Sequence, residues 1–353
     1  MFEEYDVDAR LRPGATEVDD ALTRLLEVEP ERLPYHDRLR GRAARHPIDI
    51  GWRGWWDVFV RVFRRVGIDN LGLITAGVTF YIFLALIPAI IAIVTFYGIF
   101  TDNVTLAAHV DFLRGYLPDQ SIEWISQELS RVAHLRDQGV TLTLAVSVLV
   151  SFWSMNNAVV ALFGAMNVAY GEREKRTTLG LYLRCFGFTF GALLLGILTI
   201  AGIVILPLVV PFFGDGSFDY GGRRVTVPLL FFLVAAGATA IYRVGPSRRP
   251  ARWRWIRVGA FAAAIGWIGA ATLLSWYLSN VANYAVMYGS LGTIIALMFW
   301  LYISVYILLA GAWLNSEIEH QTIVDTTVGP PRPVGERGAY VADTIGREAG
   351  RHS

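Results

Sequence analysis

Residues 76–90 read AGVTFYIFLALIPAI, an almost wholly apolar stretch inside a longer apolar run over residues 71–100. This run is too long for a buried strand, and it lacks the polar face that a helix of a soluble domain would show. It also exceeds the roughly 20 residues that are needed to cross the hydrocarbon core of a bilayer. The run therefore predicts a membrane-spanning helix, long enough to tilt, to kink or to extend beyond the bilayer.

Further apolar runs predict five more membrane-spanning helices, at residues 140–166, 179–213, 225–242, 258–278 and 291–314. The composition agrees, since 54% of the 353 residues are hydrophobic and 17% are charged. Soluble domains carry roughly 25% charged residues. We therefore expect an all-α polytopic membrane protein with six transmembrane helices, whose membrane domain covers residues 49–320.

Two amphipathic segments are predicted to lie at the membrane surface rather than across it. Residues 52–67, WRGWWDVFVRVFRRVG, place Trp and Phe at helical spacing with Arg on the other side. Such an N-terminal helix suits the membrane interface, although packing on protein is the alternative. Residues 101–139 contain phrases such as SIEWISQELSRVAHL and predict short periplasmic helices.

The two ends of the chain are predicted to be polar cytoplasmic tails, at residues 1–48 and 321–353. The second is predicted to be an extended linker, because GPPRP resists helix formation.

Basic residues are divided unevenly between the two sides that six spans would define. Of the 31 Lys and Arg residues, 12 precede the first span, 3 follow the second, 6 follow the fourth and 4 follow the sixth. Only 5 lie in the other connections, and Arg184 lies within the third span. Because basic residues are retained on the cytoplasmic side, both termini are predicted to be cytoplasmic.

Polar side chains at membrane depth are costly, so they are candidates for function. Pro88 would free the carbonyl of Leu84 and kink the first span, which is one way to open a lateral gap. We hypothesise that five polar residues in or beside the first two spans line or brace an amphipathic, lipid-binding cavity. The alternative is that they only tie helices together by hydrogen bonds. The five are Tyr81, Asn156, Asn157, Asn167 and Tyr170.

Five sequence elements follow one another within residues 50–320. They are AGVTFYIFLALIPAI at 76–90, FWSMNNAVVALFGAMNVAYGE at 152–172, YRVGP at 242–246, YGSLGTIIALMFWLYIS at 288–304 and GAWLNSEIEH at 311–320. In this order they resemble the YihY/BrkB family of bacterial inner-membrane proteins. The resemblance implies a multi-pass protein of the bacterial inner membrane, linked to envelope integrity and to movement of lipids or lipid-like molecules. The family was formerly labelled ribonuclease BN, a label now regarded as misassigned.

The sequence offers little to a hydrolytic enzyme. None of the six His residues lies in a predicted span, and none has HxH or HExxH spacing. Glu317 and Glu319 flank the end of the sixth span, but residues two apart point to different faces of a helix. Cys185 is the single cysteine, which excludes an intrachain disulfide. We therefore expect no enzyme, no metal site and no cofactor. The basic loop at residues 248–257 follows from topology and predicts no nucleic-acid partner.

Two functions from different classes remain. The first is a protein that binds or moves lipids through a partly polar intramembrane cavity, with membrane lipids as its partners. The second is a non-transporting membrane scaffold that docks envelope proteins through residues 101–139 and its tails. Ribonuclease activity is a remote third hypothesis, and the sequence leaves a homo-oligomer open. Bound lipid would favour the first function, and a sealed bundle the second.

Overall fold

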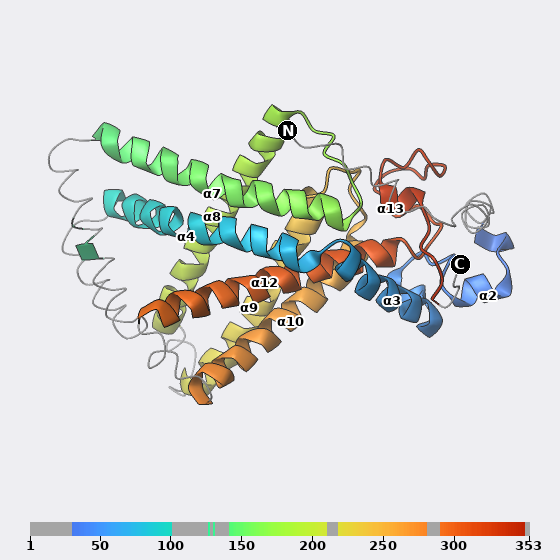
Figure 1. The fold of residues 1–353 in the computed structure, drawn as a ribbon. Coiled ribbons are helices and arrows are strands. Elements are labelled where there is room, and N and C mark those ends of the chain that lie inside the picture. The colour runs from blue at the N-terminus through green and yellow to red at the C-terminus, as the bar shows by residue number, and fades with distance from the viewer. Residues whose placement is uncertain are drawn as a thin grey trace. The chain divides into compact units, whose positions relative to one another are not determined.

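The computed structural model of the chain describes residues 30–100, 126–127, 130, 141–209, 218–280 and 290–349. This part of the chain consists of helices and loops, with one isolated antiparallel bridge between Ala251 and Thr327 (Figure 1). The predicted all-α class is confirmed. The predictions for residues 1–29 lie outside the described residues, as do those for residues 101–139 apart from Ser126, Gln127 and Ser130, which are helical.

Six long helices overlap the six apolar runs of the sequence. They are α4 (Leu71–Phe100), α7 (Thr141–Ala169), α8 (Thr178–Val209), α9 (Phe218–Val244), α10 (Trp253–Asn280) and α12 (Ser290–Glu319). Most of them extend past the apolar run by up to about two turns, because polar residues such as Asn315 continue the same helix.

Not all of the six long helices meet the length and hydropathy expected of a membrane span within the described residues. Within the described residues, four segments are long and apolar enough to cross a membrane: Leu149–Ala169, Thr178–Leu195, Trp253–Tyr277 and Ile294–Glu319. A fifth is obtained if Trp52–Ile68 and Leu71–Leu86, which meet at a bend of 65°, form one broken span. The apolar part of α9, Leu230–Val244, is shorter. The chain is therefore a polytopic membrane protein with four to five candidate spans in its described part, and the count of six stays a prediction.

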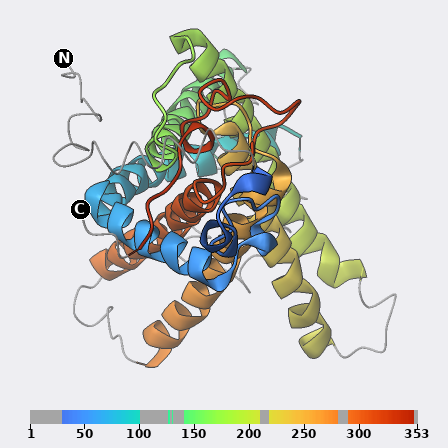
Figure 2. The same ribbon diagram turned by 90° about the vertical axis from the view of Figure 1, so that its right-hand side faces the viewer.

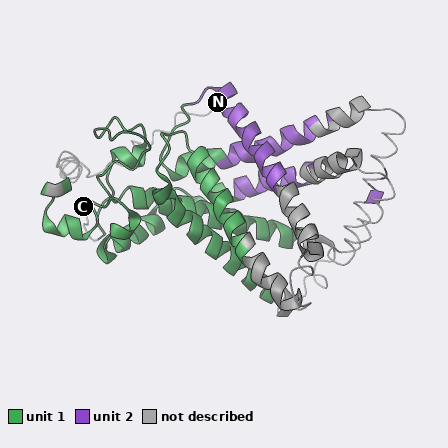
Figure 3. Ribbon diagram, turned by 180° about the vertical axis from the view of Figure 1, so that it is seen from behind, with its two compact units in different colours: residues 1–75, 163–175, 227–353 green, residues 76–162, 176–226 purple. Residues whose placement is uncertain are grey.

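The chain divides into two compact units (Figure 3). Unit 1 comprises residues 1–75, 163–175 and 227–353, and it contains α3 (Trp52–Ile68), α10, α12 and most of the described part of α9. Unit 2 comprises residues 76–162 and 176–226, and it contains most of α4 and α7 together with α8.

In unit 1, α12 packs against α10 and α3. At the crossing of α10 and α12, a Cβ atom on Gly311 would lie 2.7 Å from the carbonyl oxygen of Gly259. Glycine therefore allows the two backbones to approach closely. Asn315 fixes the crossing, because its Oδ1 accepts a hydrogen bond from Gly259 N (2.7 Å) and its Nδ2 donates to the carbonyl of Ile256 (2.8 Å). This crossing sets the position of the C-terminal end of α12.

Helix α3 turns most of its aromatic side chains outward and part of its polar side inward. Trp52 and Phe63 are 76% and 77% exposed, and Trp56 and Phe59 are also exposed. Asp57, in contrast, is fully buried. A helix packed only on protein would show the opposite pattern. The exposed aromatic face agrees with the predicted amphipathic helix.

The segments on either side of the membrane domain fold onto unit 1. The N-terminal part forms η2 (Pro30–Arg32), α2 (Tyr35–Leu39) and η3 (Pro47–Asp49), and the C-terminal part forms α13 (Tyr340–Asp343). Both segments lie beside the C-terminal end of α12 (Figure 2). Leu33, Ile323 and Ile345 make a small apolar cluster there. The structure of residues 321–349 thus differs from the predicted extended linker, because buried Thr, Ile and Val residues scattered without periodicity attach this segment.

Candidate functional site

One group of buried polar side chains lies among the helices of unit 2. Asn156 on α7 is fully buried, and its Oδ1 accepts a long hydrogen bond from the hydroxyl of Thr189 on α8 (3.5 Å). Its Nδ2 has no hydrogen-bond partner among the described residues. The hydroxyl of Thr79 on α4 is likewise buried and has no partner within the described part of the chain. We call Thr79, Asn156 and Thr189 the polar layer.

The polar layer borders an apolar cluster built by the same three helices. The cluster consists of Ala85, Met155 and Ala158, with Ile82, Phe152 and Leu193 packed against them. Each member of the polar layer lies three or four residues, one helical turn, from a cluster residue on its own helix. Residues at this spacing share a helix face, so the layer and the cluster face the same interior. Buried polar groups left unsatisfied cost roughly 1–3 kcal/mol each, so the layer favours a polar group that would pair with it.

The other candidates on unit 2 lie at its surface. Tyr81 is 45% exposed and touches the neighbouring ring of Phe80 edge-on, and Asn157 is exposed. Pro88 lies inside α4, which continues on both sides of it. Asn156 is thus the one sequence candidate that the described residues place in the interior of unit 2.

Asn167 and Tyr170 lie in unit 1, at the end of α7. Asn167 donates from Nδ2 to the carboxylate of Glu174 (2.9 Å), and its Oδ1 accepts a hydrogen bond from the backbone of Ser247 (2.7 Å). The buried ring of Tyr170 lies 5.0 Å from the guanidinium carbon of Arg248. Burial raises the pKa of Tyr170. Both residues therefore tie the loop after α7 to the loop after α9.

The five candidates are divided between the two units. Asn167 and Tyr170 lie together in unit 1, whereas Tyr81, Asn156 and Asn157 belong to unit 2. One cavity shared by all five therefore stays a prediction.

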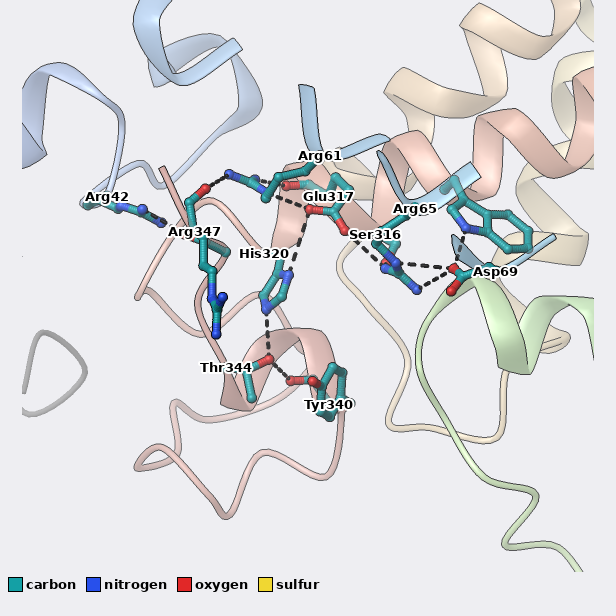
Figure 4. A network of polar contacts seen from close by, with 12 residues as sticks. Arg42, Arg61, Arg65, Asp69, Ser316, Glu317, His320, Tyr340, Thr344 and Arg347 are labelled. Atoms are coloured by element: carbon teal, nitrogen blue, oxygen red, sulfur yellow. Dashed lines mark hydrogen bonds and ion pairs between the residues drawn. The ribbon is translucent and has the colours of Figure 1, made fainter. Parts of the chain in front are cut away.

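A buried ionic network joins α3 to the C-terminal end of α12 in unit 1 (Figure 4). The carboxylate of Glu317 accepts hydrogen bonds from Arg61 Nε (2.6 Å) and Arg65 Nη1 (3.0 Å). Arg65 also pairs with Asp69 (3.2 Å), which accepts a hydrogen bond from the indole of Trp313 (2.8 Å). Arg61 and Arg65 of α3 are thus committed to protein contacts, while most of its aromatic side chains stay exposed.

Glu319 has separate partners on another face of α12. Arg248 Nη2 donates to its carboxylate (2.7 Å), and so does the hydroxyl of Thr326 (2.9 Å). Although burial opposes its charge, the contact with Glu319 leaves the pKa of Arg248 raised. The prediction that Glu317 and Glu319 point to different faces is confirmed.

His320 lies between these contacts and the C-terminal segment. Its Nδ1 is 3.7 Å from the carboxylate of Glu317, and its Nε2 is 2.9 Å from the hydroxyl of Thr344 (Figure 4). Burial lowers the pKa of His320. Sequence reasoning did not select Arg61, Arg65, Arg248 or His320 as members of a site. In the described ranges, no three His, Cys, Asp or Glu side chains gather so as to hold a metal ion.

The family model of virulence factor BrkB matches residues 62–335. The chain belongs to this family. The match confirms the resemblance drawn from the sequence, and it contains α4 to α12 and the C-terminal part of α3.

Curated relatives of this BrkB-family chain are distant. YfkH of Bacillus subtilis, which is named as ribonuclease-like, is 26% identical over 257 residues, covering 69% of this chain and 88% of YfkH. A UPF0761 membrane protein of Albidiferax ferrireducens is 26% identical over 284 residues, covering 75% of this chain and 65% of that protein. The chain therefore spans less than two thirds of that relative. A UPF0761 membrane protein of Haemophilus influenzae is 23% identical over 265 residues, covering 73% and 93%. No solved structure matches the chain.

Proposed function

We propose that this BrkB-family protein binds or moves lipids or lipid-like molecules through a partly polar site inside the membrane, and so contributes to envelope integrity. The observation that carries the proposal is the amide nitrogen of Asn156, which is fully buried on a candidate membrane-spanning helix and has no hydrogen-bond partner among the described residues. In hydrocarbon, an amide without a hydrogen-bond partner costs several kcal/mol, about 4–8 kcal/mol on the strictest transfer scale. A headgroup oxygen or hydroxyl would remove that cost.

The chemistry of the polar layer suits an amphiphile. Asn156 offers N–H donors, and the hydroxyl of Thr79 can donate or accept. Neither carries a fixed charge, so the layer can be desolvated without the penalty that a buried ion brings. A headgroup would pair with these groups while its acyl chains stay in the bilayer.

We further propose six spans, a location in the bacterial inner membrane and cytoplasmic termini. Helices α4 and α9 overlap the two predicted spans that the described residues do not establish by themselves. The basic residues are divided 25 to 5 between the two sides, with Arg184 within a span. Helix α3, with aromatic side chains exposed and Arg61 and Arg65 turned to Glu317, would lie in the cytoplasmic interface.

We propose that the protein is not an enzyme. The carboxylate of Glu317 is held by two arginines and that of Glu319 by Arg248, so neither is available as a general base. The word ribonuclease in the name of YfkH describes that relative.

Native mass spectrometry of the gently solubilised full chain would test the lipid-binding proposal. Asn156→Leu should lose bound lipid, because the substitution removes the unpaired amide. Asn157→Leu is the matched control, because Asn157 is exposed and lies outside the proposed site. This variant should keep its bound lipid. The thermal unfolding midpoint of Asn156→Leu should stay near that of the wild type.

Two results would contradict this reading. If Asn156→Leu unfolds early and lipid falls only in proportion to the folded protein, Asn156 ties helices together and binds no ligand. If the wild-type protein carries no lipid but copurifies with envelope proteins, the scaffold function would take its place.

A further inference from the structure

Three arginines of unit 1 contact residues 346–348, which are among the last described residues of the chain. Arg40 and Arg42 follow α2, and Arg61 lies on α3. We call them the arginine triad. Arg40 pairs with Asp57 (2.6 Å) and Arg61 with Glu317 (2.6 Å), so each holds a carboxylate.

Arg42 is the exception within the triad. Its side chain is fully buried, and its Nη2 donates to the carbonyl of Gly346 (2.7 Å). Its Nε and Nη1 have no hydrogen-bond partner among the residues that the structure describes. Burial, together with the nearby charge of Arg61, lowers the pKa of Arg42 to about 10. A buried guanidinium with two donor atoms that no described residue uses has the chemistry of an anion-binding group.

Residues 344–349, which we call the C-terminal strap, cover the triad. Three consecutive strap residues present oxygen atoms to three different arginines. These are the carbonyl of Gly346 to Arg42 (2.7 Å), the carbonyl of Arg347 to Arg61 (3.0 Å) and the carboxylate of Glu348 to Arg40 (3.7 Å). Figure 4 shows the carbonyl of Arg347 turned toward Arg61. The strap thus supplies an acceptor oxygen to each of the three arginines.

Further contacts besides those to the triad attach the strap. Gly346 N donates to the carbonyl of His320 (2.7 Å), and Ala349 N donates to Asp57 (2.8 Å). The hydroxyl of Thr344 meets His320, and Ile345 is buried. A phosphate oxygen attracts a guanidinium by its full negative charge as well as by hydrogen bonding, whereas a carbonyl oxygen carries only a partial charge. A phosphate group would therefore compete well with the two neutral carbonyls of the strap.

We propose that the arginine triad is a binding site for a phosphate-bearing anion, and that the C-terminal strap occupies this site until it is displaced. The anion is either the headgroup of an anionic phospholipid or a free phosphate, which share the same oxygen acceptors. The site lies in unit 1, so it does not depend on the polar layer of unit 2 or on the function proposed for it.

The test uses the full chain in detergent, with two probes: inorganic phosphate and short-chain phosphatidylglycerol. Gly346→Leu should displace the strap, because a Cβ atom there would lie 2.5 Å from Arg61 Nε and 2.6 Å from its Cζ. Gly67→Leu is the matched control, since a Cβ atom on Gly67 meets nothing within 4 Å. By calorimetric titration, Gly346→Leu should bind at least one probe about tenfold more tightly than the wild type, because the competing closed state is removed. Gly67→Leu should bind like the wild type.

A second substitution at Arg42 identifies the binding group. Adding Arg42→Gln to Gly346→Leu should remove the gain in affinity. If that double variant does not fold, Arg42→Lys replaces it and should lose most of the gain, because lysine keeps the charge but not the planar fork.

The pattern of binding also names the source of the anion. A gain for phosphatidylglycerol alone assigns the site to a lipid headgroup, and a gain for inorganic phosphate alone assigns it to free phosphate. A gain for both assigns it to the phosphate group they share. Equal affinity of Gly346→Leu and the wild type for both probes would overturn the proposal. A gain that survives substitution of Arg42 would also overturn it.

Discussion

Replacing Glu317 by glutamine should destabilise the protein strongly, because one carboxylate compensates two arginines. The side chain of Glu317 is 1% exposed, and those of Arg61 and Arg65 are 11% and 22% exposed. Removing one partner of a buried ion pair costs about 3–5 kcal/mol. Arg65 would keep Asp69 as a partner, so the lower value, about 3 kcal/mol, is the better expectation.

The change is measurable by thermal unfolding in detergent, followed through the fluorescence of the 11 tryptophans. At about 2 °C per kcal/mol, the midpoint should fall by roughly 6 °C. Glu336→Gln is the control, because Glu336 is exposed and surface substitutions usually change stability by less than about 0.5 kcal/mol. Adding Arg61→Gln to Glu317→Gln should cost less than the sum of the single changes, since it removes an uncompensated charge. A Glu317→Gln midpoint that matches the Glu336→Gln midpoint would refute the reasoning.

Three further predictions concern packing, pH and topology. Gly311→Ala should lower the unfolding free energy by about 1–3 kcal/mol, measured as a lower thermal midpoint, because the added Cβ presses on the carbonyl of Gly259. Because the pKa of His320 is depressed in the folded protein, the stability that neutral His320 contributes is complete above pH 6.5 and is lost as the pH falls below that value. Between neutral pH and about pH 5.5, the thermal midpoint of His320→Gln should therefore fall less than that of the wild type. Cysteines introduced at the exposed positions Ser130 and Glu336 should be labelled from opposite sides of the membrane, and labelling of both from outside intact cells would contradict the proposed topology.

The positions of the helices could be predicted from the sequence because the bilayer imposes a simple requirement. A run such as residues 71–100 has few alternatives to a helix, since every backbone polar group must be satisfied within the segment. The amphipathic pattern of residues 52–67 likewise predicted a helix, and α3 covers these residues. What the pattern left out was the direction of Arg61 and Arg65, which turn to Glu317 rather than to solvent. Charge spacing identifies a polar face without naming its partner.

The candidate site was predictable only in part, for a related reason. Asn156 could be selected because an amide is conspicuous in an apolar run, and it is buried. Its neighbour Asn157 satisfied the same criterion, but the rotation of the helix exposes it. Arg42 carried no signal, since one arginine in a basic segment looks like any other. The burial of Arg42 depends on the fold of residues 344–349, and no periodic pattern in the sequence predicts that fold.

The ion pair between Arg61 and Glu317 can form only late in the synthesis of the chain. The two residues are 256 positions apart in the chain. At about 5–20 residues per second, the ribosome needs roughly 13–50 s to reach Glu317 after it has made Arg61. Throughout that interval the guanidinium of Arg61 lacks the carboxylate with which it pairs in the folded protein. The packing of α3 against α12 therefore forms only after the other long helices of the described chain have been made.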